Sequence, residues 1–463
     1  MRDTVQVHEH DNVVIAVRTL KKGTILGEGP AEGILLLQDI PQGHKISCMD
    51  IPLGKPVIRY GVVLGYATED IVCGQWVHEQ NIHLGEIPSL ENFSYGHAVV
   101  MELPVSPRTT FEGYYNGPNV PAGTRNILGI TTTVQCVAGI LNVAVERIKK
   151  DLLPLYPHVD GVVALNHAYG CGVAINAPDA YIPIRSIQNL AHNPNFGNEL
   201  MVIGLGCEKL TVERLLKTSD NSKDNVIVLQ DFQGFDAIME AIVQMARKKL
   251  EILNRRVRQT LPLSFLRIGM QCGGSDAFSG ISANPAAGKA SDLLVGAGAT
   301  VLFSEVTEVR DGVQFLFERC QDHETAQKLA EEMQWYDDYL AKGGVGRDAN
   351  PTPGNKKGGL SNIIEKAMGS IAKSGKAPIA EVVGCGEWPR KTGLIFAATP
   401  ASDIVCGPMQ VASGITLQVF MTGRGTPYGL APVPVIKVSS RSDLKIMWPD
   451  LIDVDAGPVI TGE

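Results

Sequence analysis

Several short loops combine glycine with side chains that could carry acid–base or metal chemistry. Asn166-His167-Ala168-Tyr169-Gly170-Cys171-Gly172 directly follows the apolar run 160–166. A general base, a metal ligand or an oxyanion donor could come from this loop, and a buried structural loop is the alternative. Loops that follow the strands of a parallel α/β sheet lie at the carboxyl ends of those strands, where ligands bind. We therefore expect such loops to form a site.

Three further loops at strand ends offer groups that bind anions. In Gly123-Thr124-Arg125-Asn126, the guanidinium of Arg125 could grip a carboxylate with two hydrogen bonds. Gly354-Asn355-Lys356-Lys357-Gly358-Gly359 places two lysines between glycines, without the spacing of a nucleotide-binding loop. Thr422-Gly423-Arg424-Gly425-Thr426-Pro427 flanks an arginine with glycines after the apolar run 416–421. A solvated turn is the alternative for each loop.

The segment Gln271-Cys272-Gly273-Gly274-Ser275-Asp276 also follows an apolar run. Its successive backbone N–H groups could form an anion-binding nest. Ser275 and Asp276 could instead cap the helix that follows. The sequence leaves both interpretations open.

Half of the ten histidines fall in the first fifth of the chain: His8, His10, His44, His78 and His83. On an expected strand, the alternation of His8 and His10 would point both rings to one face. These histidines are candidate metal ligands, although no HExxH or other fixed ligand spacing is present. Isolated surface or core histidines are the alternative.

Four regions follow one another along the chain. Residues 1–85 show short apolar runs between Gly, Pro and charged turns, which is typical of a small β module. Residues 86–110 contain prolines and lack periodicity, which favours a linker. Residues 111–258 and 259–463 alternate strand-like and helix-like runs, which predicts two parallel α/β domains. The Gly/Pro/Asn/Lys-rich stretch 343–359 is expected to be a long loop.

Composition excludes several classes of protein. The formal net charge of -8 argues against a general nucleic-acid binder. No stretch approaches the roughly 20 apolar residues that span a bilayer, and the first residues are polar. We therefore expect a cytoplasmic protein with reduced cysteines. The nine cysteines include no CxxC pair, which disfavours a zinc ribbon.

Long stretches of the chain resemble the altronate/galactarate dehydratase family. They include IPQGHK with IRYGVVLGYA, GTRNILGITTTVQCVAG, DGVVALNHAYGCGVAINAP, GMQCGGSDAFSG, NPTPGNKKGGLSNIIEKAMGSIAKSG and TGRGTPYGLAPVPVIK. The resemblance covers almost the whole chain. It implies an N-terminal SAF-like β-clip module followed by two α/β domains of Rossmann-like type. Members usually continue into a further helical segment, so we expect a shortened chain or a shorter relative.

The resemblance implies dehydration of a sugar acid, most simply galactarate to 5-dehydro-4-deoxy-D-glucarate, with iron(II) or another divalent cation. The enzymes acting on altronate share the arginine at Arg125, and Trp76-Val77-His78-Glu79-Gln80-Asn81 leans toward their pattern. An altronate-type substrate is therefore the alternative. The expected partner is a small sugar acid, with neither nucleic acid nor membrane, and we expect a homo-oligomer, most simply a dimer.

Such a dehydration needs a base for the proton beside a carboxylate, a stabiliser for the resulting dianion and an acid for the leaving hydroxyl. We expect catalysis from His44, His167, Arg125, Lys356 and Lys357. Candidate substrate-binding residues are Arg125, Asn126, Ser275, Asp276, Asn355, Lys356 and Arg424, and candidate metal ligands are His8, His44, His78, His167 and Glu305. Cys171 could ligate iron or fill space.

Three alternatives to this mechanism stay open. In an iron–sulfur dehydratase, thiolates could come from Cys136, Cys171, Cys207, Cys272, Cys385 and Cys406, although clusters often use closely spaced cysteines. A non-catalytic sugar-acid binding protein would show no turnover. A related sulfo-lyase would act on sulfolactate.

Overall fold

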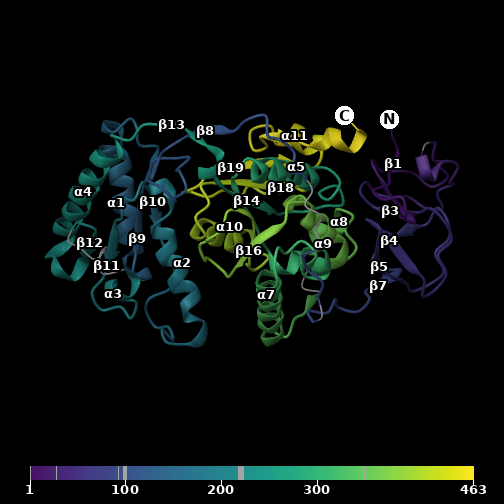
Figure 1. The fold of residues 1–463 in the computed structure, drawn as a ribbon, viewed down its shortest axis with the longest axis horizontal. Helices are drawn as coiled ribbons and strands as arrows, with labels where there is room; N and C mark the ends of the chain where they lie inside the picture. The colour runs from purple at the N-terminus through teal and green to yellow at the C-terminus, as the bar shows by residue number, and fades with distance from the viewer. Residues whose placement is uncertain are drawn as a thin grey trace.

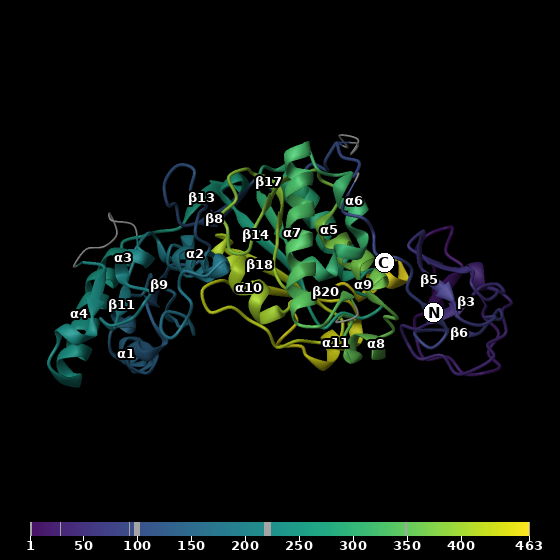
Figure 2. The ribbon, with the colours of Figure 1, turned by 90° about the horizontal axis from the view of Figure 1, so that it is seen from below.

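The structure is a computed structural model that describes residues 2–27, 29–91, 93–96, 102–216, 224–347 and 350–462. Three lobes lie in a row, and their order in space differs from their order in sequence (Figure 1). The N-terminal module (residues 2–85) is at one end. The large-sheet lobe, built on β14–β20, is in the middle, and the small-sheet lobe, built on β9–β12, is at the other end. Figure 2 shows the same order in a second view.

The N-terminal module consists of two small antiparallel sheets, as its alternating apolar runs predict. The first sheet has the order β1-β2-β3-β6, and the second has the order β4-β5-β7. The strands are β1 (Thr4–Val5), β2 (Val13–Ala16), β3 (Lys45–Ser47), β4 (Pro56–Arg59), β5 (Val62–Ala67), β6 (Trp76–Val77) and β7 (Ile82–His83). His8 and His10 lie in a turn between β1 and β2, so the expectation that they share a strand is wrong.

The segment after the module runs along the large-sheet lobe. The guanidinium Nη1 of Arg310 donates to the Pro88 carbonyl at 2.8 Å, and the Phe93 ring stacks on Phe317 with centroids 4.4 Å apart. The chain then forms β8 (Thr110–Gly113), which pairs antiparallel with β13 (Gln259–Pro262). The chain therefore enters and leaves the small-sheet lobe through one two-stranded ribbon.

The small-sheet lobe contains a parallel sheet of the order β10-β9-β11-β12, as the buried apolar runs predict. Helices cover it because apolar residues of α1 and α4 recur at helical spacing and pack into one core. The elements are β9 (Ile127–Thr132), α1 (Ala138–Asp151), β10 (Gly161–Leu165), α2 (Tyr181–Ala191), β11 (Val202–Gly204), α3 (Val212–Leu215), β12 (Val226–Val228) and α4 (Gly234–Leu253).

The large-sheet lobe contains a seven-stranded parallel sheet of the order β16-β17-β15-β14-β18-β19-β20. The strand order reverses between the neighbouring strands β14 and β18. The carboxyl ends of these two strands therefore form a topological switch point, where ligands bind in such sheets. The strands are β14 (Arg267–Cys272), β15 (Thr300–Phe303), β16 (Ile379–Val383), β17 (Gly393–Ala397), β18 (Leu417–Thr422), β19 (Val435–Ser439) and β20 (Val454–Asp455). The expected α/β character of this region is confirmed.

Seven α-helices are described in this lobe: α5 (Ala283–Gly296), α6 (Val313–Phe317), α7 (His323–Lys342), α8 (Pro353–Lys357), α9 (Ile363–Ile371), α10 (Asp403–Ala412) and α11 (Ser442–Met447). The expectation of a structureless loop over 343–359 is wrong at α8. Thr352 and Asn355 form a reciprocal capping box and Pro353 occupies the first turn, so a helix starts despite the glycines. Among the described residues, no helix is long and apolar enough to cross a membrane.

Candidate functional site

The N-terminal module is joined to the large-sheet lobe by a buried ion pair. The ammonium of Lys45 on β3 donates to both carboxylate oxygens of Glu365 at 3.0 and 2.8 Å, and to the Gly359 carbonyl at 2.8 Å. Arg59, on β4, also pairs with Glu365. Glu365 lies on α9, so one carboxylate compensates two cations of the module. This contact fixes α9 and the loop after α8 beneath the module.

Next to this contact lies a group of aromatic and charged side chains that we call the outer cluster. The Trp76 indole N–H donates to Nδ1 of His44 at 3.1 Å, and the His44 and His78 rings are 4.8 Å apart. The Lys356 ammonium pairs with Glu79 at 2.5 Å. The outer cluster therefore brings residues of the module together with the end of α8. Its members are His44, Trp76, His78, Glu79 and Lys356.

Burial keeps both imidazoles of the outer cluster neutral. Desolvation, with a smaller contribution from Lys45, lowers the pKa of His44 to about 4 and the pKa of His78 to about 3. Because Nδ1 of His44 accepts from Trp76, its Nε2 carries the proton and faces the Lys357 carbonyl at 3.4 Å. Nδ1 of His78 is buried and has no hydrogen-bond partner among the described residues. His78 thus has an unpartnered ring nitrogen in this group.

Deeper in the large-sheet lobe lies a second group, which we call the inner cluster. Its side chains come from the end of β14, from the turn after β15, and from α9 and the 3-10 turn that follows it. All of them are buried. Its members are Cys272, Glu305, Glu308, Lys366, Ser370 and Lys373.

The Lys373 ammonium is at the centre of the inner cluster. Its Nζ lies 3.3 Å from Cys272 Sγ, 3.7 Å from Glu305 Oε2 and 3.9 Å from Glu308 Oε2. It also donates to Ser370 Oγ at 2.6 Å. The ammonium of Lys366 pairs with Glu308 at 2.8 Å. Lys366 and Lys373 therefore both lie beside the Glu308 carboxylate, and Lys373 also lies beside Glu305.

The two carboxyl groups of the inner cluster are shifted in opposite directions. Burial, reinforced by the charge of Glu308, raises the pKa of Glu305 well above its ordinary value. Burial alone would also raise the pKa of Glu308, but Lys366 and Lys373 lower it below its ordinary value. Glu305 is thus held as the acid and Glu308 as the carboxylate. Groups with pKa values pushed apart in this way are suited to acid and base roles.

Glu305 also has an unusual backbone. Its φ of 77° lies in the left-handed region, which costs a residue other than glycine about 1–3 kcal/mol. The Glu305 N–H donates to Thr399 Oγ1 at 3.2 Å, and this bond helps hold the conformation. Strain of this kind persists where the surrounding structure enforces it, and it gathers at functional sites.

A cavity between Tyr60 of the module and the inner cluster has a volume of about 10 Å³, with Cys272, Lys366 and Ser370 in its wall. That is room for about one water molecule. A ligand larger than water therefore does not fit this cavity as it stands.

The strand-end residues predicted from the sequence lie beside these clusters. Asn355 donates to the Ser275 carbonyl at 2.9 Å and accepts from Lys366 at 3.3 Å, so it links α8 to the inner cluster. The backbone N–H of Arg424 donates to the Gly274 carbonyl at 2.8 Å. Residues 274–275, α8 and residue 424 therefore meet at the carboxyl end of the large sheet.

Asp276 has a structural role in this edge. Its carboxylate accepts from Ser279 and Ser440 hydroxyls, each at 3.0 Å, and pairs with Arg441 at 3.0 Å. It also accepts from the backbone N–H of Phe278 at 3.1 Å. Its oxygens are therefore engaged in holding the turn at 276–279. The expectation that Asp276 caps the next helix is wrong, because α5 begins only at Ala283 and Ser282 is its N-cap residue.

The remaining predicted residues lie elsewhere. Arg125 and Asn126 precede β9, at the amino end of the small sheet, so the expectation that their loop follows a strand is wrong. Arg125 forms a half-exposed ion pair with Asp160, and buried Asn126 donates to the His158 and Leu253 carbonyls. Figure 1 places this lobe at the opposite end of the molecule from the module.

His167 and His8 are also outside both clusters. His167 follows β10 in the small-sheet lobe, where Nε2 lies 2.7 Å from the Thr132 carbonyl and Nδ1 accepts from the Tyr169 N–H at 3.1 Å. Burial lowers its pKa. Both nitrogens are therefore engaged. His8 is exposed in the module and packs against His10 with ring centroids 5.1 Å apart.

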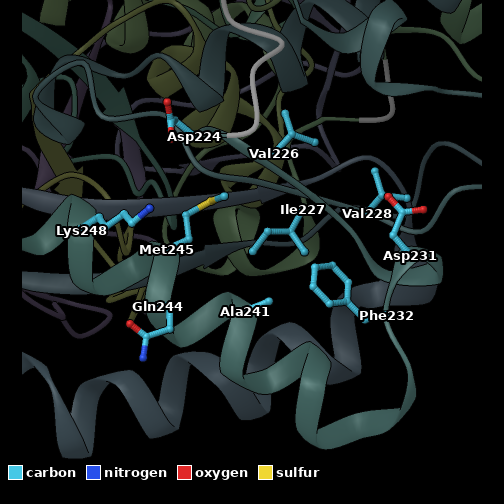
Figure 3. Close-up of a pocket in the computed structure, with 10 residues that line it drawn as sticks. All are labelled: Asp224, Val226, Ile227, Val228, Asp231, Phe232, Ala241, Gln244, Met245 and Lys248. Carbon is cyan, nitrogen blue, oxygen red and sulfur yellow. The ribbon is translucent and has the colours of Figure 1, made fainter.

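One groove on the surface shows none of this chemistry. It has a volume of about 520 Å³ and lies between the edge strand β12 and α4, as Figure 3 shows. Apolar side chains such as Val226, Phe232 and Met245 line it. It contains none of the residues predicted from the sequence, and we therefore place the candidate site at the two clusters.

Comparison with known proteins decides the family. Residues 2–85 match the altronate/galactarate dehydratase SAF domain, residues 113–254 match the D-galactarate dehydratase/altronate hydrolase second domain, and residues 263–463 match the D-galactarate/altronate dehydratase C-terminal domain. Galactarate dehydratase (L-threo-forming) of Escherichia coli K12 is 55% identical, over 99% of this chain and 89% of its own length. The chain belongs to the D-galactarate/altronate dehydratase family. The predicted resemblance is confirmed.

Two altronate dehydratases of this family are less similar to the chain. The Bacillus subtilis 168 protein is 32% identical over 99% of this chain and 90% of its own length. The Escherichia coli K12 protein is 33% identical over 99% of this chain and 91% of its own length. The chain is thus nearer to the galactarate enzyme than to either of these two.

Iron(II), implied for this family, can be tested against the side chains. Ligand atoms of Cys272, Glu305 and Glu308 lie within 4.8 Å of one another and could hold a metal ion. However, the Lys373 ammonium already lies 3.3–3.9 Å from all three. A divalent cation about 4 Å from an ammonium is repelled by roughly 8 kcal/mol at an effective dielectric constant of about 20. As arranged, the inner cluster does not fit iron(II), because Lys373 takes the place of the cation.

More residues of the outer cluster than of the inner cluster were predicted from the sequence. Of the inner residues, Glu305 was predicted as a metal ligand and Cys272 as a possible iron–sulfur thiolate, and the other four were not predicted. A signal for Glu308 was present: Glu305 and Glu308 come two and five residues after the apolar run 299–303, at the carboxyl end of a strand. Lys366 and Lys373 are seven residues apart, which places them on one face over two helical turns.

Proposed function

We propose that this family member is a hydro-lyase that dehydrates galactarate to 5-dehydro-4-deoxy-D-glucarate. The observation that carries the proposal is the pair of buried carboxyl groups, Glu305 and Glu308, on either side of the Lys373 ammonium. The 55% identity to a galactarate dehydratase supports the choice of substrate. The keto-acid product forms by tautomerisation of the enol, so the reaction needs no redox cofactor.

Each step of the reaction is assigned to a side chain. The Glu308 carboxylate takes the proton on the carbon beside the substrate carboxylate. Lys373 is held charged, since Cys272, Glu305 and Glu308 raise its pKa against the effect of burial, and it stabilises the dianion that forms. Protonated Glu305 gives its proton to the leaving hydroxyl. No step is routed through a divalent metal here, because the inner cluster does not fit one.

We assign the second carboxylate of galactarate to the cationic groups nearer the surface. Lys356 and Arg424 lie at the carboxyl end of the large sheet, and Lys356 pairs with Glu79 in this structure. A dicarboxylate needs two separate cationic binding sites. In this arrangement a substrate carboxylate would take the place of Glu79 at Lys356.

The proposal is tested by keto-acid formation from galactarate, glucarate and altronate, with and without iron(II). We expect galactarate to be the best substrate. Preference for altronate would support the altronate-type function, to which Arg125 and residues 76–81 point. No turnover of any sugar acid, with binding retained, would support a binding protein, and turnover of sulfolactate would indicate the sulfo-lyase.

Organisational features are proposed on the same basis. We propose that both α/β lobes are Rossmann-like. Each contains a parallel sheet, and helices connect all successive strands of the small sheet and most of those of the large sheet. We propose domain boundaries at 1–85, 86–110, 111–258 and 259–463, which limited proteolysis tests. We also propose a cytoplasmic homodimer, which fractionation and light scattering test.

A further inference from the structure

Three exposed cysteines of the small-sheet lobe each follow a strand of its parallel sheet. Cys136 follows β9, Cys171 follows β10 and Cys207 follows β11, so all three lie at the carboxyl edge of neighbouring strands. All three are exposed, whereas the other six cysteines are buried or half-buried. All nine lie within the described ranges. Their thiols therefore form a separate set that the proposed reaction does not use.

The three loops are held together at Gly170. The Gly170 carbonyl accepts from the N–H groups of Lys209 and Leu210 at 2.9 and 3.1 Å. A Cβ at Gly170 would lie 2.2 Å from the Thr133 carbonyl oxygen and 3.1 Å from Val134 Cα. The loop after β10 thus touches the loops after β9 and β11.

Each cysteine is close in sequence to that contact. Cys171 follows Gly170, Cys136 comes two residues after Val134, and Cys207 comes two residues before Lys209. With consecutive Cα atoms 3.8 Å apart, each cysteine Cα lies within about 8 Å of the residue that makes the contact. The backbones of three cysteines from distant parts of the sequence therefore lie near one contact between loops.

A buried carboxylate strengthens this arrangement. Glu208 accepts from the Thr133 hydroxyl and from the N–H groups of Leu205 and Gly206, at 3.1 and 2.6 Å. It therefore ties the loop after β9 to the loop that carries Cys207. Gly170 and Gly206 have φ of 109° and 120°, conformations that only glycine adopts easily.

We infer that Cys136, Cys171 and Cys207 bind a [4Fe–4S] cluster through three thiolates. Thiolates bind iron–sulfur clusters, zinc and copper(I). A structural zinc site would require a fourth ligand, and both ring nitrogens of nearby His167 are already engaged. Three thiolates for four irons leave one iron at the surface for a small oxygen ligand. The inference is independent of the substrate assigned above.

This inference is tested by measuring the iron and acid-labile sulfide content of protein purified without oxygen. We expect about four of each per chain, broad visible absorption that bleaches on reduction, and loss of both in Cys136→Ser, Cys171→Ser and Cys207→Ser. Cys73→Ser is the matched control, because Cys73 is half-buried in the N-terminal module. It should keep the full cluster.

Thiol alkylation gives a second readout that does not depend on how the variants fold. In the intact protein, the cluster should protect the three thiols from alkylation, and its removal by oxygen and chelator should expose them. Iron without labile sulfide, zinc in place of iron, or equal alkylation before and after chelation would each overturn the inference. Galactarate turnover by cluster-free protein would leave the proposed function standing.

Discussion

In the large-sheet lobe, the loops after β14 and β15 turn inward beneath the N-terminal module, and the side chains that they carry are buried. In the small-sheet lobe, the loops after β9, β10 and β11 stay at the surface, and the cysteines that they carry are exposed. Both sheets are parallel and both present polar loops at the same edge. Burial therefore decides which chemistry each edge supports: shifted carboxyl groups in one, accessible thiols in the other.

Removing the buried acid should have the largest effect. Glu305→Gln keeps the shape of the side chain but cannot give a proton to the leaving hydroxyl, so we expect kcat for galactarate to fall about 10²–10⁴-fold. Steady-state kinetics measure this. Glu324→Gln, at an exposed position on α7, is the control. Unchanged kcat in Glu305→Gln would move the acid out of the inner cluster.

The docking of the module should depend on Glu365. Glu365→Gln leaves Lys45 and Arg59 buried without a countercharge, and loss of one partner from a buried pair costs about 3–5 kcal/mol. Denaturant unfolding measures the change, and proteolysis should cut residues 86–91 faster. Glu331→Gln breaks an exposed ion pair with Lys328 and should cost about 0–1 kcal/mol. Equal stability of the two variants would contradict this role.

The pH dependence of stability should report on His44. Its pKa is about 4 in the folded protein and 6.5 when unperturbed, so the unfolded chain binds more protons between these values. The stability that His44 contributes is therefore complete above pH 6.5 and is lost as pH falls toward 4. His44→Gln removes this dependence. As the pH falls from 6.5 to 4, the Tm of the variant minus the Tm of the wild type should therefore rise. A constant difference in Tm would show that His44 is not held neutral.

The smallest effect is expected at Arg125, because its ion pair with Asp160 is half-exposed. Arg125→Met should change the free energy of unfolding by about 0–1 kcal/mol and leave KM for galactarate unchanged. Kinetics across galactarate and altronate check this. A large rise in KM would place a substrate carboxylate in the small-sheet lobe and would break the contrast between the two edges.

The sequence predicted the fold better than the site. The apolar run 266–272 identified a central strand, because a strand buried on both faces reads as a nearly continuous apolar run. The turn 7–10 and the helix α8 were missed, because a local cap at Thr352 and Asn355 outweighed the glycines of that segment. His44, His78 and Lys356 were predicted, and the structure brings them together.

Other site residues could not be predicted, because they depend on contacts between lobes. Nothing near His167 or Arg125 in the sequence shows that their lobe lies far from His44. Cys136, Cys171 and Cys207 looked too widely spaced for a cluster. Their separations of 35 and 36 residues are those of successive strand–helix units, which return the chain to the same edge of the sheet.

The ribbon of β8 and β13 has a consequence for how such proteins diversify. Because the chain enters and leaves the small-sheet lobe side by side, this lobe has the form of an insertion with adjacent ends, which domains tolerate well. Exchange of this lobe would leave the path of the chain through the other two unchanged. Recombination within β8 and β13 would therefore replace the small-sheet lobe and leave the N-terminal module and the large-sheet lobe as they are.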